Sequence, residues 1–176
     1  MEEIQACARA GLTRGYPDGT YRPADTVTRD QMAVYIARAL AGGDSGVTTP
    51  TGAATFADVP TDYWAYRYVE YCHSRDIVEG YADGYHPTEV VTRAQMAAYV
   101  ARSIVDPTGD AGLAGYTPPL VATFPDITND YWAYTYIEYC KAQSIVNGYD
   151  DGYRPEAVVT RDQMAVYLQR AFGLAE

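Results

Sequence analysis

The sequence predicts an all-α fold built from one unit of about 50 residues that is used three times. Residues 56–104 and 124–172 are identical at 28 of 49 positions, and residues 1–40 carry a shortened copy of the same unit. In each copy, apolar residues recur at helical spacing on both sides of a glycine-containing turn. We therefore expect three helix-loop-helix repeats that bury a common core.

The repeats divide the chain into five segments. A truncated first repeat (1–40), a second repeat (56–104) and a third repeat (124–172) are separated by linkers at 41–55 and 105–123. Both linkers are rich in small, polar, Gly and Pro residues, which is typical of surface connections between units. The chain is long enough to bury roughly two-thirds of its unfolded surface without covalent staples.

The first helix of each repeat carries one apolar face. Residues 2–12 are predicted to be helical, and in the second repeat the helix is expected to begin near Tyr63, with Asp62 as its capping residue. Because this face is apolar three times over, we expect the three first helices to meet in one core. The face comprises Ile4, Cys7 and Ala8; Ala65, Tyr68, Val69 and Cys72; and Ala133, Tyr136, Ile137 and Cys140.

A turn and a capped second helix follow in every repeat. The Gly-Tyr-x-Asp-Gly turn favours positive φ angles, and Thr-Arg-x-Gln then opens the helix. In this capping box, the threonine hydroxyl accepts a hydrogen bond from the glutamine amide, and the glutamine side chain reaches back to the threonine amide. The boxes begin at Thr28, Thr92 and Thr160.

Charge and composition limit the classes of partner. A net charge of −10 disfavours binding to nucleic acid or to an anionic membrane surface, because general attraction becomes repulsion. No run of about 20 apolar residues is present, so we expect no membrane insertion. The 18 tyrosines exceed what a core of this size needs and suit partly exposed grooves.

The cysteines and histidines give no catalytic or metal-binding pattern. Cys7, Cys72 and Cys140 occupy equivalent positions and are expected to be buried thiols, rather than disulfide or metal partners. His73 and His86 occur in one repeat alone, and neither pairs with a nucleophile in a repeated way. We expect no enzyme, no cofactor and no metal.

Three arginines occupy an unfavourable position. Arg29, Arg93 and Arg161 lie in the first turn of a predicted helix, where a cation opposes the helix dipole. One interpretation is an anion site, in which free amides, the dipole and the guanidinium bind a carboxylate or phosphate. The other is an ion pair within the chain, with an acidic neighbour such as Asp30, Asp83 or Asp162.

The aromatic residues also allow two interpretations. Trp64 and Trp132 precede tyrosines in Trp-Ala-Tyr-x-Tyr and are either core residues at helix starts or platforms for a sugar. The turn tyrosines Tyr81 and Tyr149 could extend such a platform. So could their counterpart Tyr16 and the following tyrosines, which are Tyr21, Tyr85 and Tyr153.

Together, these motifs resemble the S-layer homology domain. The resemblance is carried by Phe-x-Asp-Val/Ile, Tyr-Trp-Ala, Gly-Tyr-x-Asp-Gly and Val-Thr-Arg-x-Gln, and it covers the chain apart from its two linkers. The family tetrapeptide usually ends in Glu, whereas this chain has Gln31, Gln95 and Gln163. The resemblance implies one compact pseudo-trimeric domain, with a pseudo-threefold axis, a central helical bundle and grooves between repeats.

The resemblance also implies a function outside the cell, at the cell surface, the cell wall or an S-layer. It implies noncovalent anchoring to a secondary cell-wall polysaccharide, which often carries pyruvate ketals. An alternative is a self-assembling surface protein that forms a lattice, tube or filament, and so a homo-oligomer. By position, the implied ligand-binding residues are Arg29, Arg93 and Arg161; Trp64 and Trp132; and Gly80, Gly148, Tyr81 and Tyr149.

The first repeat departs from the family pattern. It lacks Phe-x-Asp-Val and Tyr-Trp, because Met1 aligns with Tyr66 of the second repeat. A groove that needs a tryptophan from this repeat is incomplete in this chain. We therefore expect at most two competent grooves.

Overall fold

The computed structural model describes residues 2–175, and its regular elements are helices. Each repeat contributes a shorter and a longer helix, and each linker contains one short helix. Among the described residues, β structure is confined to isolated bridges between single residue pairs. The helices are α1 (Glu2–Arg9), α2 (Arg29–Ala41), η1 (Asp44–Gly46), α3 (Tyr66–His73), α4 (Arg93–Ile104), α5 (Asp110–Leu113), α6 (Tyr134–Ala142) and α7 (Arg161–Phe172).

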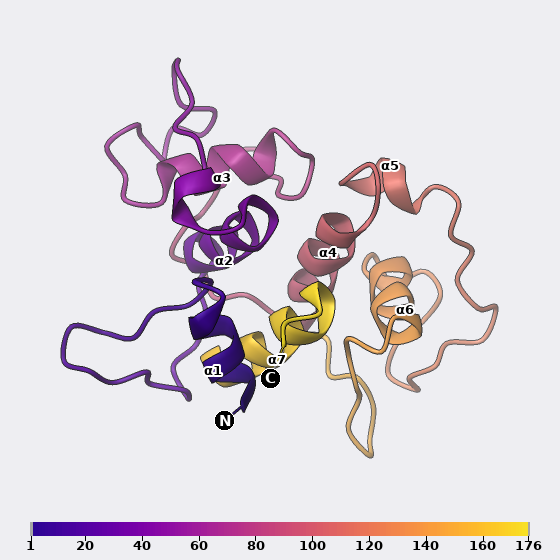
Figure 1. Cartoon of the computed structure of the whole chain (residues 1–176). Coiled ribbons are helices and arrows are strands. Elements are labelled where there is room, and N and C mark those ends of the chain that lie inside the picture. Colours follow the sequence, from indigo (N-terminus) through magenta and orange to yellow (C-terminus); the bar gives the residue numbers. More distant parts are fainter. Residues whose placement is uncertain (1, 176) are drawn as a thin grey trace.

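The three second helices form the centre of the molecule. Helices α2, α4 and α7 contact one another pairwise and lie around a common axis (Figure 1). A buried valine precedes each of these helices, and its backbone amide donates a hydrogen bond to the carbonyl of the equivalent valine in another repeat. The bonds are Val27 N to Val159 O at 2.9 Å, Val91 N to Val27 O at 2.8 Å, and Val159 N to Val91 O at 2.9 Å. This closed ring of hydrogen bonds confirms the expected pseudo-threefold arrangement.

The first helices lie on the outside and do not meet one another, although their buried faces belong to one hydrophobic core, as expected. Helix α3 packs on α2, α6 packs on α4 and α1 packs on α7, whereas α1, α3 and α6 do not contact one another within the described chain. Each apolar face therefore covers the second helix of the preceding repeat. The α1–α7 pair joins the first and last repeats and closes the ring.

The cysteines lie at the centre of these helix pairs and confirm the buried-thiol interpretation. All three are free and buried, and each thiol points at a backbone carbonyl of the partner helix: Cys7 Sγ to Ala165 O, Cys72 Sγ to Ala33 O and Cys140 Sγ to Ala97 O, at 3.4–3.5 Å. Burial raises the pKa of the Cys72 thiol to about 12, so it is protonated at neutral pH.

The starts of the two kinds of helix differ in how well local sequence predicts them. All three predicted capping boxes are present, and α2, α4 and α7 begin directly after their threonines. The predicted Asp62 cap is wrong, because α3 begins at Tyr66 and its N-cap residue makes no side-chain bond. Two successive turns precede it instead, with Tyr63 N bonded to Pro60 O at 2.8 Å and Tyr66 N bonded to Tyr63 O at 3.0 Å. Trp64 therefore lies in a turn and not on the helix.

The helix predicted at residues 2–12 needs two corrections, because α1 ends at Arg9 and its buried face differs from the predicted one. Cys7 is buried and Ile4 is partly buried, but Ala8 is exposed and Ala6 is buried in its place. With eight residues, α1 covers α7 over little more than two turns.

In both linkers, an aspartate forms hydrogen bonds to the helices on either side. The Asp44 carboxylate accepts hydrogen bonds from Arg38 Nε at 2.7 Å and from the Tyr68 hydroxyl at 2.6 Å, so it joins the linker to α2 and α3. The second linker repeats this arrangement with Asp110, Arg102 and Tyr136. These connections, expected to be plain surface segments, therefore fix helices of two neighbouring repeats.

Candidate ligand-binding grooves

Three grooves between repeats follow one construction. Each is lined by the turn and the second helix of one repeat, together with an arginine from the preceding repeat. We name each groove by that residue. The Arg29 groove has a volume of about 470 Å³, the Arg161 groove about 160 Å³ and the Arg93 groove about 220 Å³.

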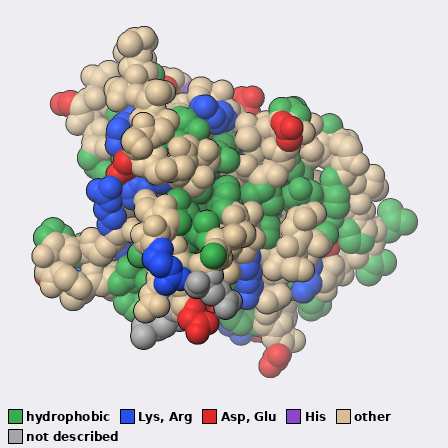
Figure 2. All heavy atoms as spheres, in the orientation of Figure 1, with side chains coloured by type: hydrophobic (Ala, Val, Ile, Leu, Met, Phe, Trp, Pro, Cys, Tyr) green, Lys and Arg blue, Asp and Glu red, His purple; other side chains and the backbone are tan. Residues whose placement is uncertain are grey.

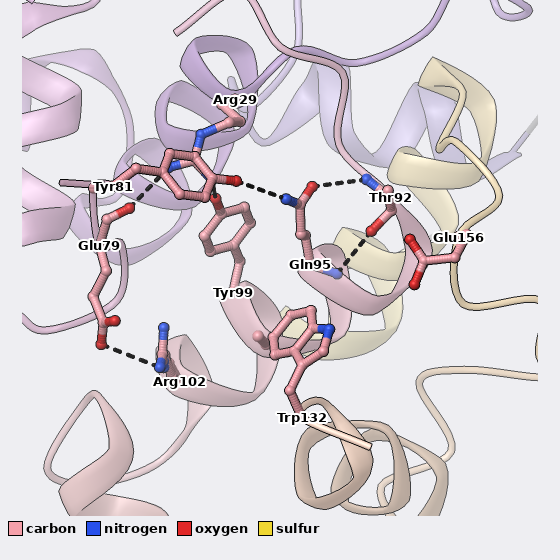
Figure 3. A pocket seen from close by; sticks show the side chains of 11 residues that line it. Arg29, Glu79, Tyr81, Thr92, Gln95, Tyr99, Arg102, Trp132 and Glu156 are labelled. Carbon is pink, nitrogen blue, oxygen red and sulfur yellow. Dashed lines mark hydrogen bonds and ion pairs between the residues drawn. The ribbon is translucent and has the colours of Figure 1, made fainter. Parts of the chain in front are cut away.

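The Arg29 groove shows how the guanidinium is held (Figure 3). Nε donates to Tyr85 O and Nη2 to Glu79 O, both at 2.8 Å, while Nη1 donates to the Tyr99 hydroxyl. The arginine therefore ties its own helix to the turn and second helix of the next repeat. The same three bonds recur from Arg93 to Tyr153, Asn147 and Tyr167, and from Arg161 to Tyr21, Arg14 and Tyr35.

The guanidinium groups are buried without a carboxylate partner. The three arginines are 2–5% exposed, and within residues 2–175 no carboxylate oxygen lies within 4.0 Å of any of them. The ion-pair interpretation is therefore wrong. Three of the five N–H donors of each guanidinium make bonds within the protein, and the other two have no partner among the described residues. A buried cation in this state favours an anion, which would compensate its charge.

The helix amides do not contribute to such a site. Arg29 N donates to Glu89 O and Asp30 N donates to Pro87 O, both at 2.9 Å, and corresponding bonds occupy the amides of the other two helices. The part of the anion interpretation that relied on free amides is therefore wrong, and the guanidinium remains as the cationic group.

Both tryptophans lie at the edges of grooves. Trp64 and Trp132 are each 56% exposed, so the core interpretation is wrong. Trp132 lines the Arg29 groove and Trp64 lines the Arg161 groove. Each indole thus comes from the repeat that follows the one carrying the groove helix. In the Arg29 groove, Arg29 and Trp132 lie on opposite sides of α4 residues Gln95 and Tyr99 (Figure 3).

The Arg93 groove differs from the other two. It brings together Arg93, Gly148 and Tyr149, but no tryptophan is among the described residues that line it. Among the residues that the structure describes, this groove therefore has the arginine without an indole.

The tyrosines fall into two groups. Tyr81 and Tyr149 are 47% and 42% exposed, and their hydroxyls accept hydrogen bonds from the side-chain amides of Gln95 and Gln163. Tyr16 lines the Arg161 groove and is partly buried. Tyr85 and Tyr153 are fully buried, so a ligand platform that includes them is wrong. Burial raises their pKa well above the usual value, and each hydroxyl donates to an arginine carbonyl.

The glycines of the turn line the grooves but have a packing role. A Cβ atom on Gly80 would lie 2.3 Å from Cε1 of Phe56, and one on Gly148 would lie 2.4 Å from Cε1 of Phe124. The phenylalanine of Phe-x-Asp therefore packs directly under the turn. The aspartate of the same motif, Asp58, accepts hydrogen bonds from the two backbone amides that follow the turn. Tyr85 N donates at 2.8 Å and His86 N at 2.7 Å.

A second arginine in each groove was missed at the sequence level. Arg38, Arg102 and Arg170 line the Arg161, Arg29 and Arg93 grooves. Their occurrence at the same place in all three repeats was the available signal. Arg102 is paired with Asp110 at 2.7 Å and with Glu79 at 3.2 Å, and Arg38 is paired with Asp44 at 2.7 Å, so these two cations are already compensated.

Charged side chains are spread over the surface of the molecule. On the face in Figure 2, Lys and Arg side chains occur at several separate places, with hydrophobic side chains gathered between them.

Within the described chain, no helix has the length and apolar character needed to cross a membrane. No group of three or more His, Cys, Asp or Glu side chains in that part is placed to hold a metal ion.

The fold and the grooves define the class of this protein: a three-repeat helical module with a ring of inter-repeat grooves. The model of the S-layer homology domain matches residues 1–33, 55–97 and 123–165, which is more than half of the chain. The chain belongs to the S-layer homology domain family.

Similar proteins come from bacterial surfaces. The chain is 28% identical over 162 residues to cell surface glycoprotein 1 of Acetivibrio thermocellus, and 28% identical over 164 residues to the cellulosome-anchoring protein of the same organism. These alignments cover 90% and 92% of the chain, but 7% and 35% of the relatives. A surface-layer 125 kDa protein of Lysinibacillus sphaericus is 25% identical over 174 residues, which is 96% of the chain and 14% of that protein. Family and relatives together indicate a module of the cell surface or cell wall.

Proposed function

We propose that this chain anchors a larger protein noncovalently to the cell wall by binding an anionic secondary cell-wall polysaccharide, with pyruvate ketals as the recognised groups. Family membership and the names of its relatives support a role in surface anchoring. The chain spans 7% and 35% of the first two relatives, which fits a module that tethers other domains.

One observation carries the proposal: a buried guanidinium without a carboxylate partner shares a groove with a half-exposed indole. Arg29 with Trp132 and Arg161 with Trp64 form the two pairs. A pyruvate ketal places a carboxylate directly on a sugar ring. The two remaining N–H groups of the guanidinium would bind that carboxylate, and charge-assisted bonds of this kind are short and strong. The C–H face of the sugar would pack on the indole.

The other groove residues have supporting roles in this proposal. Tyr81 and Gln95 form a hydrogen-bonded edge beside Arg29 and would contact sugar hydroxyls. Gly80 would keep the turn close to Phe56 and so shape the groove wall. In the Arg93 groove, Tyr149, Gln163 and Gly148 form the same edge without an indole, so we propose that this groove binds weakly or not at all.

We also propose that the chain itself is not catalytic. Some relatives are enzymes by name, among them an endoglucanase from a Bacillus strain, but the chain covers 14% of that protein. The features of the grooves are those of recognition: guanidinium donors held by hydrogen bonds, and an exposed aromatic surface.

A cell-wall pulldown tests the proposal. The double variant Trp64→Ala/Trp132→Ala should no longer sediment with purified walls, because both exposed indoles are removed without opening the core. Leu120→Ala/Val121→Ala is the matched control, since it removes two even more exposed apolar side chains outside the grooves and should bind normally. Walls from which pyruvate ketals have been removed should not bind the wild-type chain. Unchanged sedimentation of the tryptophan variant would contradict the proposal.

Self-assembly is a second candidate, supported by one feature. Leu120 and Val121 are 89% and 82% exposed in the second linker, directly after Pro118 and Pro119. An exposed apolar segment suits a contact between subunits. Light scattering at rising protein concentration distinguishes the candidates. A chain that stays monomeric, with no difference between wild type and Leu120→Ser/Val121→Ser, would rule out assembly through this segment.

A further inference from the structure

Trp132 separates two cavities. One is the Arg29 groove, and the other is a cavity of about 230 Å³ that lies between α5 and α6 and is lined by Asp110, Leu113, Thr135 and Tyr136. The indole is 56% exposed, so it can serve as a wall of both. The second cavity belongs to the linker and the third repeat and holds none of the groove arginines.

Two differences between repeats accompany the open space: the second linker has α5 where the first has η1, and one position of the following helix differs. In the second repeat, the residue equivalent to Thr135 is Arg67. It donates to the Tyr68 hydroxyl at 2.6 Å, and its guanidinium carbon lies 4.6 Å from the centroid of the Tyr68 ring. It also lies 3.6 Å from the linker carboxylate Asp44. Arg67 thus covers the tyrosine beside its linker, whereas the short Thr135 leaves Tyr136 open to the cavity.

We infer that the cavity is a second sugar subsite, specific to the Trp132 side, that binds an uncharged sugar unit next to the acidic unit. This inference rests on the proposed function. No Lys or Arg side chain in the described chain lines the cavity, so none is placed there to bind a second anion. Asp110 Oδ2 accepts one bond, from Arg102 at 2.9 Å, and can accept another from a sugar hydroxyl. Thr135 offers a donor and an acceptor.

Two adjacent units of the polymer would then both contact the Trp132 indole, which lines both cavities. The carboxylate-bearing unit lies toward Arg29, and its neutral neighbour lies toward Tyr136, whose ring centroid is 6.4 Å from that of Trp132. On the Trp64 side, Arg67 replaces the second subsite, so only one unit is recognised there. The two tryptophan grooves therefore differ in the length of glycan that they recognise.

Calorimetry with two kinds of probe tests this inference. The probes are a methyl hexoside with a pyruvate ketal and the disaccharides in which a neutral hexose extends it in either direction. In a Trp64→Ala background, the Arg29 groove with Trp132 keeps its indole. There, one disaccharide should bind about tenfold more tightly than the monosaccharide. Adding Thr135→Arg should abolish that gain and leave monosaccharide affinity unchanged, because Thr135 does not line the Arg29 groove.

The reciprocal variant is the matched control. In a Trp132→Ala background, Arg67→Thr should create a preference for the disaccharide at Trp64. Equal binding of all probes by the Trp64→Ala chain, or a disaccharide gain that survives Thr135→Arg, would overturn the subsite while leaving the proposed function intact. Failure of every probe to bind would overturn the proposed function and the subsite together.

Discussion

At the scale of a single residue, each groove arginine joins neighbouring repeats and, in the proposed function, also binds the ligand. Arg29 holds the turn of the next repeat through Tyr85 O and Glu79 O, and it presents its remaining donors to the groove. Its repeated position was visible in the sequence, because a cation in the first helical turn opposes the helix dipole and is therefore unusual there. Its bonds to carbonyls were not visible, since they depend on how neighbouring repeats meet. The ion-pair alternative failed because backbone carbonyls and a tyrosine hydroxyl satisfy the buried side chain instead.

Substitution of this arginine should therefore affect stability as well as binding. Arg29→Ala leaves two carbonyls and the Tyr99 hydroxyl without their partner, and we expect it to lower the unfolding free energy by about 3 kcal/mol. Arg29→Lys should recover only part of this loss, because one ammonium cannot reproduce a three-way planar contact. Urea denaturation measures both variants. An Arg29→Ala chain that unfolds at the wild-type urea concentration would contradict this role.

The turn glycine gives a prediction of the same scale. Gly80→Ala should cost about 1–3 kcal/mol, because its Cβ would overlap the Phe56 ring 2.3 Å away. Gly115→Ala is the matched control, since a Cβ atom added there would meet nothing within 4 Å and the stability should be nearly unchanged. Thermal unfolding of the two variants side by side is sufficient. Equal midpoints would show that the glycine is not needed for packing.

At the scale of elements, local signals were predictive and distant contacts were not. The capping boxes at Thr28, Thr92 and Thr160 placed the second helices correctly, because both partners lie within four residues. Periodicity also identified the buried face around Cys72. It could not show that this face covers α2 of the preceding repeat, since a periodic pattern defines which side is buried and not what covers it.

The linker aspartates predict a pH dependence. Burial alone would raise the pKa of Asp44, but hydrogen bonds from Arg38 and Tyr68 outweigh it and hold the pKa below its usual value. Hydrogen bonds from Arg102 lower the pKa of Asp110 in the same way. A carboxylate with a lowered pKa in the folded state stabilises the protein above its unfolded pKa of about 4, and this contribution is lost as the pH falls through the folded value.

We therefore expect the unfolding free energy to fall steadily below about pH 4, and the variant Asp44→Asn to show a smaller fall over that range. Urea unfolding at a series of pH values measures the difference between the two chains. Parallel curves for wild type and Asp44→Asn would show that the interactions of Asp44 carry no such linkage.

At the scale of the whole molecule, the ring explains why the grooves are unequal. The Arg29 and Arg161 grooves each combine side chains from all three repeats of the ring, which is closed by α1 on α7 (Figure 1). The groove that would take its indole from the first repeat is the Arg93 groove, and none of its described lining residues is a tryptophan. The sequence predicted that a groove would be incomplete. It could not predict which one, because the pairing of Trp132 with Arg29 depends on the packing of α6 against α4.

The stoichiometry of binding tests the central claim most directly. Isothermal titration of the chain with a methyl hexoside carrying a pyruvate ketal should give two sites per chain, since two grooves combine an unpaired buried arginine with an exposed indole. Trp132→Ala should reduce the number to one, with Trp64 as the remaining indole. Three equivalent sites, or a stoichiometry that does not change when Trp132 is removed, would contradict the account.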